Sequence, residues 1–118
     1  MIIDCETYYR AQPLVGKTLG LAGLIRQADE AGVDKMILMP EGGVRPKNCE
    51  LAELLDSSPD VRGRFIPCAW LNPQFGDEAV RELEIAIREW GFRGLKLMPT
   101  HHNFRAVSSL PYPLMRKA

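Results

Sequence analysis

Three side chains able to do chemistry stand two residues apart near the start of the chain, namely Asp4, Glu6 and Tyr8. Alternate residues of a strand share one face of its sheet. The apolar residues 2–5 predict a strand that ends directly before Glu6, so the two carboxylates and the phenol should point in one direction. Such a row is typical of an oxygen-rich metal site or of a site for acid–base chemistry.

Glu6 is the best candidate metal ligand in this row, because an ionised carboxylate is a hard oxygen donor suited to Zn, Mn or Mg. The alternative is a solvated carboxylate at a strand end. Tyr8 is a second candidate ligand, although a phenol ionises only near about pH 10 unless a cation lowers that value. The simpler interpretation of Tyr8 is a packed ring with a hydrogen-bonded hydroxyl. Asp4 is expected to orient its neighbours or to anchor the strand.

Lys96 is a candidate substrate-binding residue. It lies between Leu95 and Leu97 in a predicted strand, and these two leucines should turn toward the helices. Lys96 should therefore face the opposite side of the sheet, where an ammonium needs a partner. That partner is either a bound substrate or a carboxylate such as Glu6 or Asp4.

His101 and His102 are the only histidines of the chain and are further substrate-binding candidates. Histidine is the usual proton shuttle or metal ligand near neutral pH, and in a loop at an active face this pair could hold a substrate carboxylate or phenol. The alternative is a solvated loop pair, because no third ligand stands at metal-binding spacing. No Gly-x-Ser-x-Gly motif, Ser-His-Asp arrangement or phosphate-binding glycine loop is present, so no catalytic residue is assigned.

A strand and a helix alternate four times along the chain, and these elements must position the candidate residues. Strands are predicted at residues 2–5, 35–39, 64–71 and 94–98. Helices are predicted from a cap at Thr18 to a stop at Gly32, over residues 48–57 before Pro59, and from a cap at Asp77 to a stop at Gly91.

Alternating strands and helices imply parallel pairing with right-handed crossovers. A repeat of about thirty residues suits either a flavodoxin-like open sheet or a (β/α)8 barrel, and composition does not separate the two. In a barrel the active site lies at the carboxyl ends of the strands. The loops at those ends are predicted to start at Glu6, Pro40, Asn72 and Pro99.

Composition is that of one folded domain, with 46% hydrophobic and 25% charged residues in 118. Fifteen basic residues balance fifteen acidic ones, so no basic field recruits nucleic acid. No apolar run approaches the roughly 20 residues of a membrane span, and no signal peptide is recognised, so a cytoplasmic location is expected. The three cysteines lack metal-binding or redox spacing and are expected to be reduced packing residues.

Several motifs resemble the amidohydrolase superfamily, in the branch of amidohydrolase-related hydrolases and non-oxidative decarboxylases. The family's first strand reads Asp-x-His-x-His, or Glu-x-His in its decarboxylases, whereas Asp4-x-Glu6-x-Tyr8 has Tyr in place of the last His. The segments at residues 31–35, 64–66, 72–73 and 91–99 also look like the first half of the family's barrel. The resemblance covers nearly the whole chain and implies a metal-dependent enzyme for a small organic substrate, with Zn or Mn at Glu6 and Tyr8.

Four units make only half of a barrel, since a complete one takes roughly 250 residues. We therefore expect residues 1–118 to form a partial amidohydrolase-like barrel domain, either a fragment or a shortened relative that pairs with another chain. The resemblance places further metal ligands and a catalytic Asp on later strands, so the chain alone is expected to be inactive. The alternative function is a non-catalytic half-barrel that forms homo-oligomers through its open strand edges.

Overall fold

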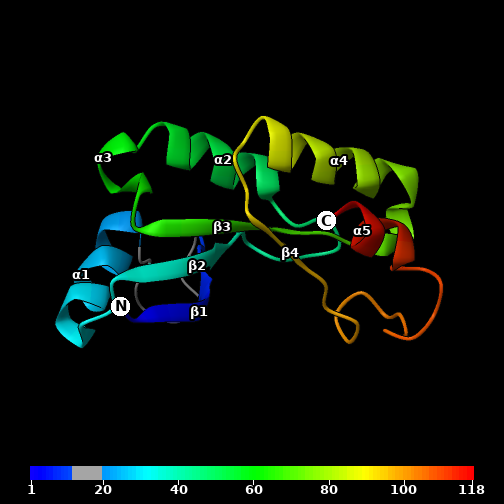
Figure 1. The fold of residues 1–118 in the computed structure, drawn as a ribbon, viewed down its shortest axis with the longest axis horizontal. Coiled ribbons are helices and arrows are strands. Elements are labelled where there is room, and N and C mark those ends of the chain that lie inside the picture. Colours follow the sequence, from blue (N-terminus) through cyan, green and yellow to red (C-terminus); the bar gives the residue numbers. More distant parts are fainter. Residues whose placement is uncertain (12–19) are drawn as a thin grey trace.

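Four strands form one parallel sheet whose order follows the chain, in a computed structural model that describes residues 1–11 and 20–118 (Figure 1). The strands are β1 (Ile3–Tyr8), β2 (Lys35–Met39), β3 (Phe65–Trp70) and β4 (Gly94–Lys96). The helices are α1 (Leu21–Ala31), α2 (Asn48–Asp56), α3 (Pro59–Arg62), α4 (Asp77–Arg88) and α5 (Tyr112–Lys117), with a 3-10 turn at Pro73–Phe75. The predicted class, four β-α units resembling the first half of a (β/α)8 barrel, is confirmed as a parallel α/β fold.

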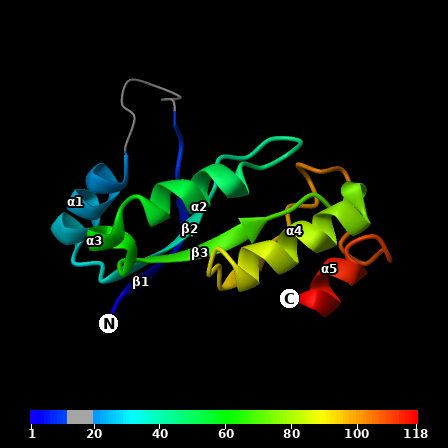
Figure 2. The same ribbon diagram turned by 90° about the horizontal axis from the view of Figure 1, so that it is seen from above.

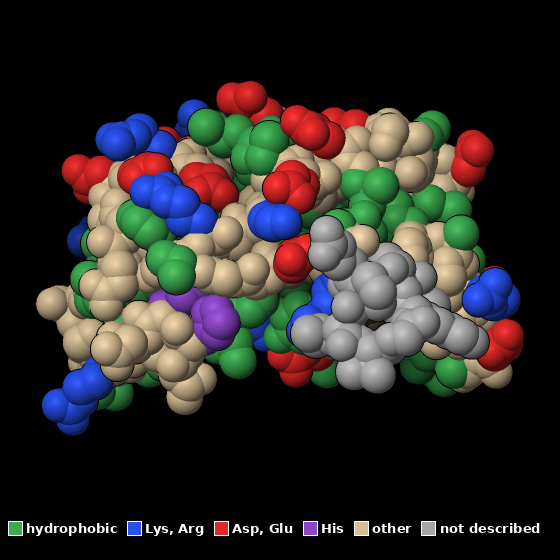
Figure 3. Space-filling view, turned by 180° about the vertical axis from the view of Figure 1, so that it is seen from behind, with side chains coloured by type: hydrophobic (Ala, Val, Ile, Leu, Met, Phe, Trp, Pro, Cys, Tyr) green, Lys and Arg blue, Asp and Glu red, His purple; other side chains and the backbone are tan. Residues whose placement is uncertain are grey.

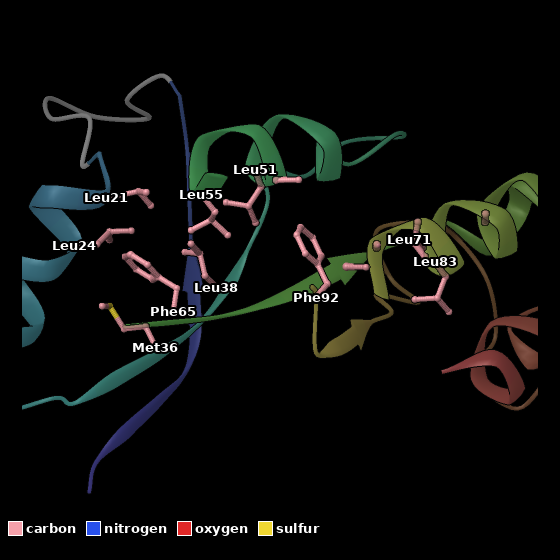
Figure 4. Packing of buried hydrophobic residues seen from close by; sticks show 14 of the residues in the cluster. Leu21, Leu24, Met36, Leu38, Leu51, Leu55, Phe65, Leu71, Leu83 and Phe92 are labelled. Carbon is pink, nitrogen blue, oxygen red and sulfur yellow. The ribbon is translucent and has the colours of Figure 1, made fainter. Parts of the chain in front are cut away.

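The hydrophobic core lies between the sheet and its helices, which gather on one side of the strands (Figure 2). Leu38 from β2 meets Leu51 and Leu55 from α2, and none of the three has any exposed surface (Figure 4). Full burial of each leucine contributes about 2 kcal/mol relative to exposure. Phe92, which follows α4, is buried in the same cluster. The core thus packs against one face of the sheet. The opposite face, which is the concave one in a barrel, remains available for a functional site.

Strand β1 is longer than predicted and carries a bulge. Asp4 pairs with Met36 and Thr7 with Leu38, so three steps along β1 match two along β2. The extra residue reverses the alternation, because a one-residue shift moves side chains to the opposite face. Asp4 therefore lies on the same face as Thr7, whose hydroxyl donates to its carboxylate at 2.8 Å. The prediction that Asp4 shares a face with Glu6 and Tyr8 is wrong, whereas its role as an anchor is confirmed.

Two predicted strand ends differ from the structure by more than one residue, while the start of β1 and both ends of β3 differ by one. Glu6 and Tyr8 lie inside β1 rather than in the loop after it, because the pairing with β2 continues to Tyr8. Strand β4 ends at Lys96 instead of residue 98. Leu95 and Leu97 still turn toward the helices as predicted, since both pack against the core.

Helix boundaries differ from the prediction by one to three residues. Gly76 takes the cap position expected for Asp77, which is the first residue of α4. Pro59 begins α3 rather than simply following α2, which already ends at Asp56. The cap predicted at Thr18 lies outside the described residues. Gly32 and Gly91 have positive φ angles of 69° and 68°, which confirms both as left-handed helix stops.

No helix among the described residues is long and apolar enough to cross a membrane. The cysteine prediction is wrong in part, because Cys5 and Cys49 are exposed and only Cys68 is half-buried.

Replacement of Gly32 by alanine tests the helix stop. Nothing lies within 4 Å of the added Cβ, so the cost is that of the left-handed backbone alone. We expect Gly32→Ala to lower the free energy of unfolding by about 1 kcal/mol in chemical denaturation. Gly63→Ala is the control, because Gly63 has an ordinary φ of −62° and equally open surroundings. Equal stability of the two variants would contradict this account.

Candidate functional site

A closed cluster of Lys96, Glu6 and Tyr8 spans the face of the sheet opposite the helices. The Lys96 Nζ lies 2.6 Å from Glu6 Oε1 and 2.5 Å from the Tyr8 hydroxyl. The Tyr8 hydroxyl donates in turn to Glu6 Oε1 at 2.6 Å. Lys96 thus pairs with Glu6, one of the two carboxylates expected for it, and Tyr8 uses its hydroxyl for hydrogen bonding. The cluster joins β1 to β4, which are not neighbours in the sheet.

The charges of the cluster stabilise one another. The hydrogen bond from Lys96 lowers the pKa of Glu6 below its ordinary value, and the bond from Tyr8 and the Lys96 charge act in the same direction. Desolvation by burial opposes the charge of Lys96, but its hydrogen bonds to Glu6 and Tyr8 outweigh this and raise the pKa of Lys96. The side chain of Lys96 is only 16% exposed, against 58% for Glu6. The ammonium is therefore the enclosed member of the pair.

Trp70, at the end of β3, forms an aromatic wall beside the cluster. Its indole lies 5.9 Å from the Tyr8 ring by centroids, in an edge-on arrangement. The Lys96 Nζ lies 4.9 Å from the Tyr8 ring centroid and 5.5 Å from that of Trp70. Both rings are within the range of a cation–π attraction. A Cβ at Gly42 would come within 2.4 Å of the indole, so only glycine lets the loop after β2 lie against Trp70.

Asn48, the first residue of α2, holds the backbone of Trp70 in place. Its amide nitrogen donates to the Trp70 carbonyl, and its amide oxygen accepts from the Trp70 N–H, both at 2.9 Å. The pairing of β2 with β3 ends at Pro67, so the amide replaces the strand contacts that Trp70 lacks on that side. Asn48 also donates to Glu82 of α4 at 2.7 Å and is only 1% exposed. The sequence analysis missed both Asn48 and Trp70.

The two histidines follow β4 and have different environments. His101 is exposed, and its ring lies 5.5 Å from that of Trp70. His102 is 5% exposed, and its Nε2 lies 2.9 Å from the Gly43 carbonyl, which can only accept. The Nε2 must therefore carry the hydrogen. The interpretation as a solvated pair is wrong for His102, which ties the loop after β4 to the loop after β2. Figure 3 shows histidine atoms in purple on one face of the molecule, where His101 is the exposed one of the two.

A cavity of about 400 Å³ opens at the carboxyl ends of the strands. It is lined by Tyr8, Arg10, Glu41, Gly42, Trp70, Met98 and His101. Tyr8 and Trp70 also flank the ammonium of Lys96, so the cluster and the cavity share two walls. Arg10 was missed by the sequence analysis, although its place just after the Asp4 to Tyr8 row was a usable signal. The structure thus brings Glu6, Tyr8, Lys96 and both histidines to one end of the sheet, while Asp4 faces away.

The sequence profile of the amidohydrolase family matches residues 41–118. The chain belongs to this family. No curated protein sequence matches the chain. The profile covers β3 with Trp70, β4, and the loop with His101 and His102, so most of the cavity wall belongs to the amidohydrolase match.

A solved amidohydrolase-like structure supports the resemblance to decarboxylases. The chain is similar to a 5-carboxyvanillate decarboxylase from Novosphingobium aromaticivorans, solved as a mutant with bound manganese and 3-methoxy-4-hydroxy-5-nitrobenzoic acid. The sequence identity is 27% and the TM-score 0.63, over 80% of this chain and 30% of that chain. The chain thus spans less than a third of the length of this neighbour.

The described residues of this amidohydrolase chain do not fit a metal ion. Among residues 1–11 and 20–118, no three His, Cys, Asp or Glu side chains gather closely enough to hold one. Glu6 is in contact with the Lys96 ammonium, and Asp4 accepts from Thr7 on the other face. Tyr8 donates its hydroxyl hydrogen to Glu6. The two expected metal ligands, Glu6 and Tyr8, therefore already contact the ammonium of Lys96.

The pH dependence of stability tests the cluster. A lowered Glu6 pKa means that the ion pair contributes fully above the ordinary value of 4.5 and is lost as the pH falls through the folded-state pKa. A raised Lys96 pKa means that the contribution persists to high pH and is lost above 10.5, as the pH rises through the folded-state pKa. We expect the stability difference between the native chain and Glu6→Gln to be constant at neutral pH and to shrink at both extremes.

Urea denaturation at a series of pH values measures this difference. Glu89→Gln, at an exposed carboxylate after α4, is the control for removal of a surface charge. A difference for Glu6→Gln that stays constant from pH 2 to 8, within about 0.3 kcal/mol, would show that the ion pair does not form in solution.

Proposed function

We propose that this chain supplies the substrate-binding part of an amidohydrolase-family enzyme that acts on a small organic acid. Decarboxylation and hydrolysis are the two reaction classes of the family resemblance. Decarboxylation is favoured, because the neighbour at 27% identity is a decarboxylase. The observation that carries the proposal is the Lys96 cluster, whose ammonium lies within 5.5 Å of the centroids of two aromatic rings that also line a cavity at the strand ends.

The shape and charge of the cavity suit a planar organic anion. Tyr8, Trp70 and His101 present ring faces or edges on which an aromatic acid can stack. Arg10 lines the same cavity, and its guanidinium can bind a carboxylate through two parallel hydrogen bonds. Glu41 also lines the cavity, but it lies 3.7 Å from Lys47, which offsets its charge. A cavity of about 400 Å³ is large enough for a single substituted benzene ring.

The proposal covers binding rather than turnover by this chain alone. The manganese of the decarboxylase is not carried over, because Glu6 and Tyr8 are already in contact with Lys96. The groups that would complete the reaction are proposed to come from outside the four β-α units. The chain alone is accordingly expected to bind an organic acid without converting it.

Binding of 5-carboxyvanillate by the chain, followed by calorimetry and by carbon dioxide release, tests this function. We expect saturable binding, no release of carbon dioxide, and a loss of affinity of roughly tenfold or more in Arg10→Met, since hydrogen bonds to charged groups contribute about 1.5–3 kcal/mol. Arg105→Met, at an exposed arginine in the loop after β4, is the matched control and should bind normally. Absence of saturable binding would refute the function, and turnover by the chain would refute the restriction to binding.

Association through the strand edges is a second candidate function. Among residues 1–11 and 20–118, strands β1 and β4 each pair with one neighbour only, which leaves a row of backbone groups on each outer edge. Ile2 and Ile3 at the β1 edge are 57% and 44% exposed. Apolar side chains next to unpaired backbone groups are typical of a surface that pairs with another strand. A second copy of this chain is the proposed partner, because four strands and four strands would close an eight-stranded ring.

Light scattering after size-exclusion chromatography measures this association. We expect a species of twice the 13.3 kDa chain mass at high concentration. Ile3→Lys should shift it to the monomer, because a lysine on an edge strand opposes pairing. Val107→Lys, at a residue 89% exposed in the loop before α5, should leave the dimer intact. A monomeric native chain at every concentration would exclude this candidate.

A further inference from the structure

We propose that Lys96 is the resident cation of this site, so that Glu6 and Tyr8 hold its ammonium in place of a divalent metal ion. The inference extends the proposed function by assigning the charge that would meet an organic anion. It concerns the chain's own residues and can be tested without any substrate.

The first support is the closed geometry of the cluster. The single oxygen Oε1 of Glu6 accepts from both Lys96 and Tyr8 at 2.6 Å. A metal ion bound to that oxygen at the usual distance of about 2.0–2.2 Å would lie next to the ammonium. Two cations at such separation repel each other strongly, more so in a partly enclosed site. Metal binding at Oε1 of Glu6 would therefore require Lys96 to leave.

The second support is the enclosure of the ammonium. Lys96 is 16% exposed, and its Nζ lies 4.9 Å from the ring centroid of Tyr8, on the hydroxyl side, and 5.5 Å from that of Trp70. Trp70 is itself held by two hydrogen bonds from Asn48. The ammonium is tethered to β4, so its effective concentration at Glu6 exceeds that of a free ion.

The third support is that two further side chains able to bind a metal, Asp4 and His102, make other contacts. The bulge in β1 turns Asp4 toward Thr7, and Asp4 also accepts from the Glu6 N–H at 3.1 Å. His102 spends its Nε2 on the Gly43 carbonyl. Among the described residues, no three His, Cys, Asp or Glu side chains gather closely enough to hold a metal ion.

The ammonium retains a hydrogen for a ligand. A lysine has three N–H donors, and the cluster uses two of them, one on Glu6 and one on Tyr8. The third N–H can bind an oxygen of an organic acid placed in the adjoining cavity. Unlike a divalent ion, the ammonium supplies a single positive charge and a hydrogen-bond donor whose position is set by β4.

Two measurements on the full chain test the inference, both without organic acid. The first is nuclear magnetic resonance of the lysine side chains. We expect the Lys96 amino group to give an ammonium signal that is protected from solvent exchange. Excess Mn²⁺ should leave this signal unchanged. The protection should be lost in Glu6→Gln and in Tyr8→Phe. Lys117, which pairs with Glu84 on the helix side, is the control and should not respond to either substitution. An unprotected Lys96 signal, or one indifferent to both substitutions, would overturn the inference.

The second measurement is Mn²⁺ binding by electron paramagnetic resonance. We expect Lys96→Met to bind Mn²⁺ at least about tenfold more tightly than the native chain, because the competing charge is removed, and Lys96→Met/Glu6→Gln to lose this gain. Lys117→Met should resemble the native chain. Stoichiometric Mn²⁺ binding by the native chain that Glu6→Gln abolishes and Lys96→Met does not improve would overturn the inference. Because the organic acid is absent, failure here is distinct from failure of the proposed binding function.

Discussion

The contact of Lys96 with Glu6 and Tyr8 is the interaction on which the arrangement of the site depends. The partners come from the first and fourth strands, which are not adjacent in the sheet. They can touch only because the sheet curves, as twisted parallel sheets do, and because the helices pack on the convex side. Glu6 is largely exposed, so the core rather than the ion pair supplies most of the stability. The ion pair instead sets the distance between the two outer strands, β1 and β4.

The bulge in β1 decides which acidic side chain joins this contact. Without the extra residue, alternation would place Asp4 and Glu6 on one face, as two competing carboxylates beside a single lysine. With it, Asp4 closes the bulge through Thr7 and the Glu6 N–H, and Glu6 alone meets the ammonium. One carboxylate balances one ammonium, which suits a site that is partly enclosed.

The sequence predicted the elements better than the site. Alternating apolar runs and the glycine stops at Gly32 and Gly91 specify strands and helices locally, and the four β-α units follow from them. The inward direction of Lys96 also followed from strand alternation, which left Glu6 and Asp4 as its possible carboxylate partners. The reversal of Asp4 could not be predicted, because a bulge depends on the register with β2. Nor could the roles of Asn48 and His102, whose hydrogen bonds reach residues 22 and 59 positions away.

The buried amide of Asn48 links the outer layer of the molecule to its concave face. Trp70 takes its backbone contacts on one side from α2, and the same amide is bonded to Glu82 of α4. On the side of β2, Trp70 is therefore positioned by two helices, while on its other side it pairs with Lys96 of β4. A shift of α4 relative to α2 would be transmitted to the indole through a single side chain, although no residue of either helix lines the cavity. The helices thus determine the position of one cavity wall in addition to burying the core.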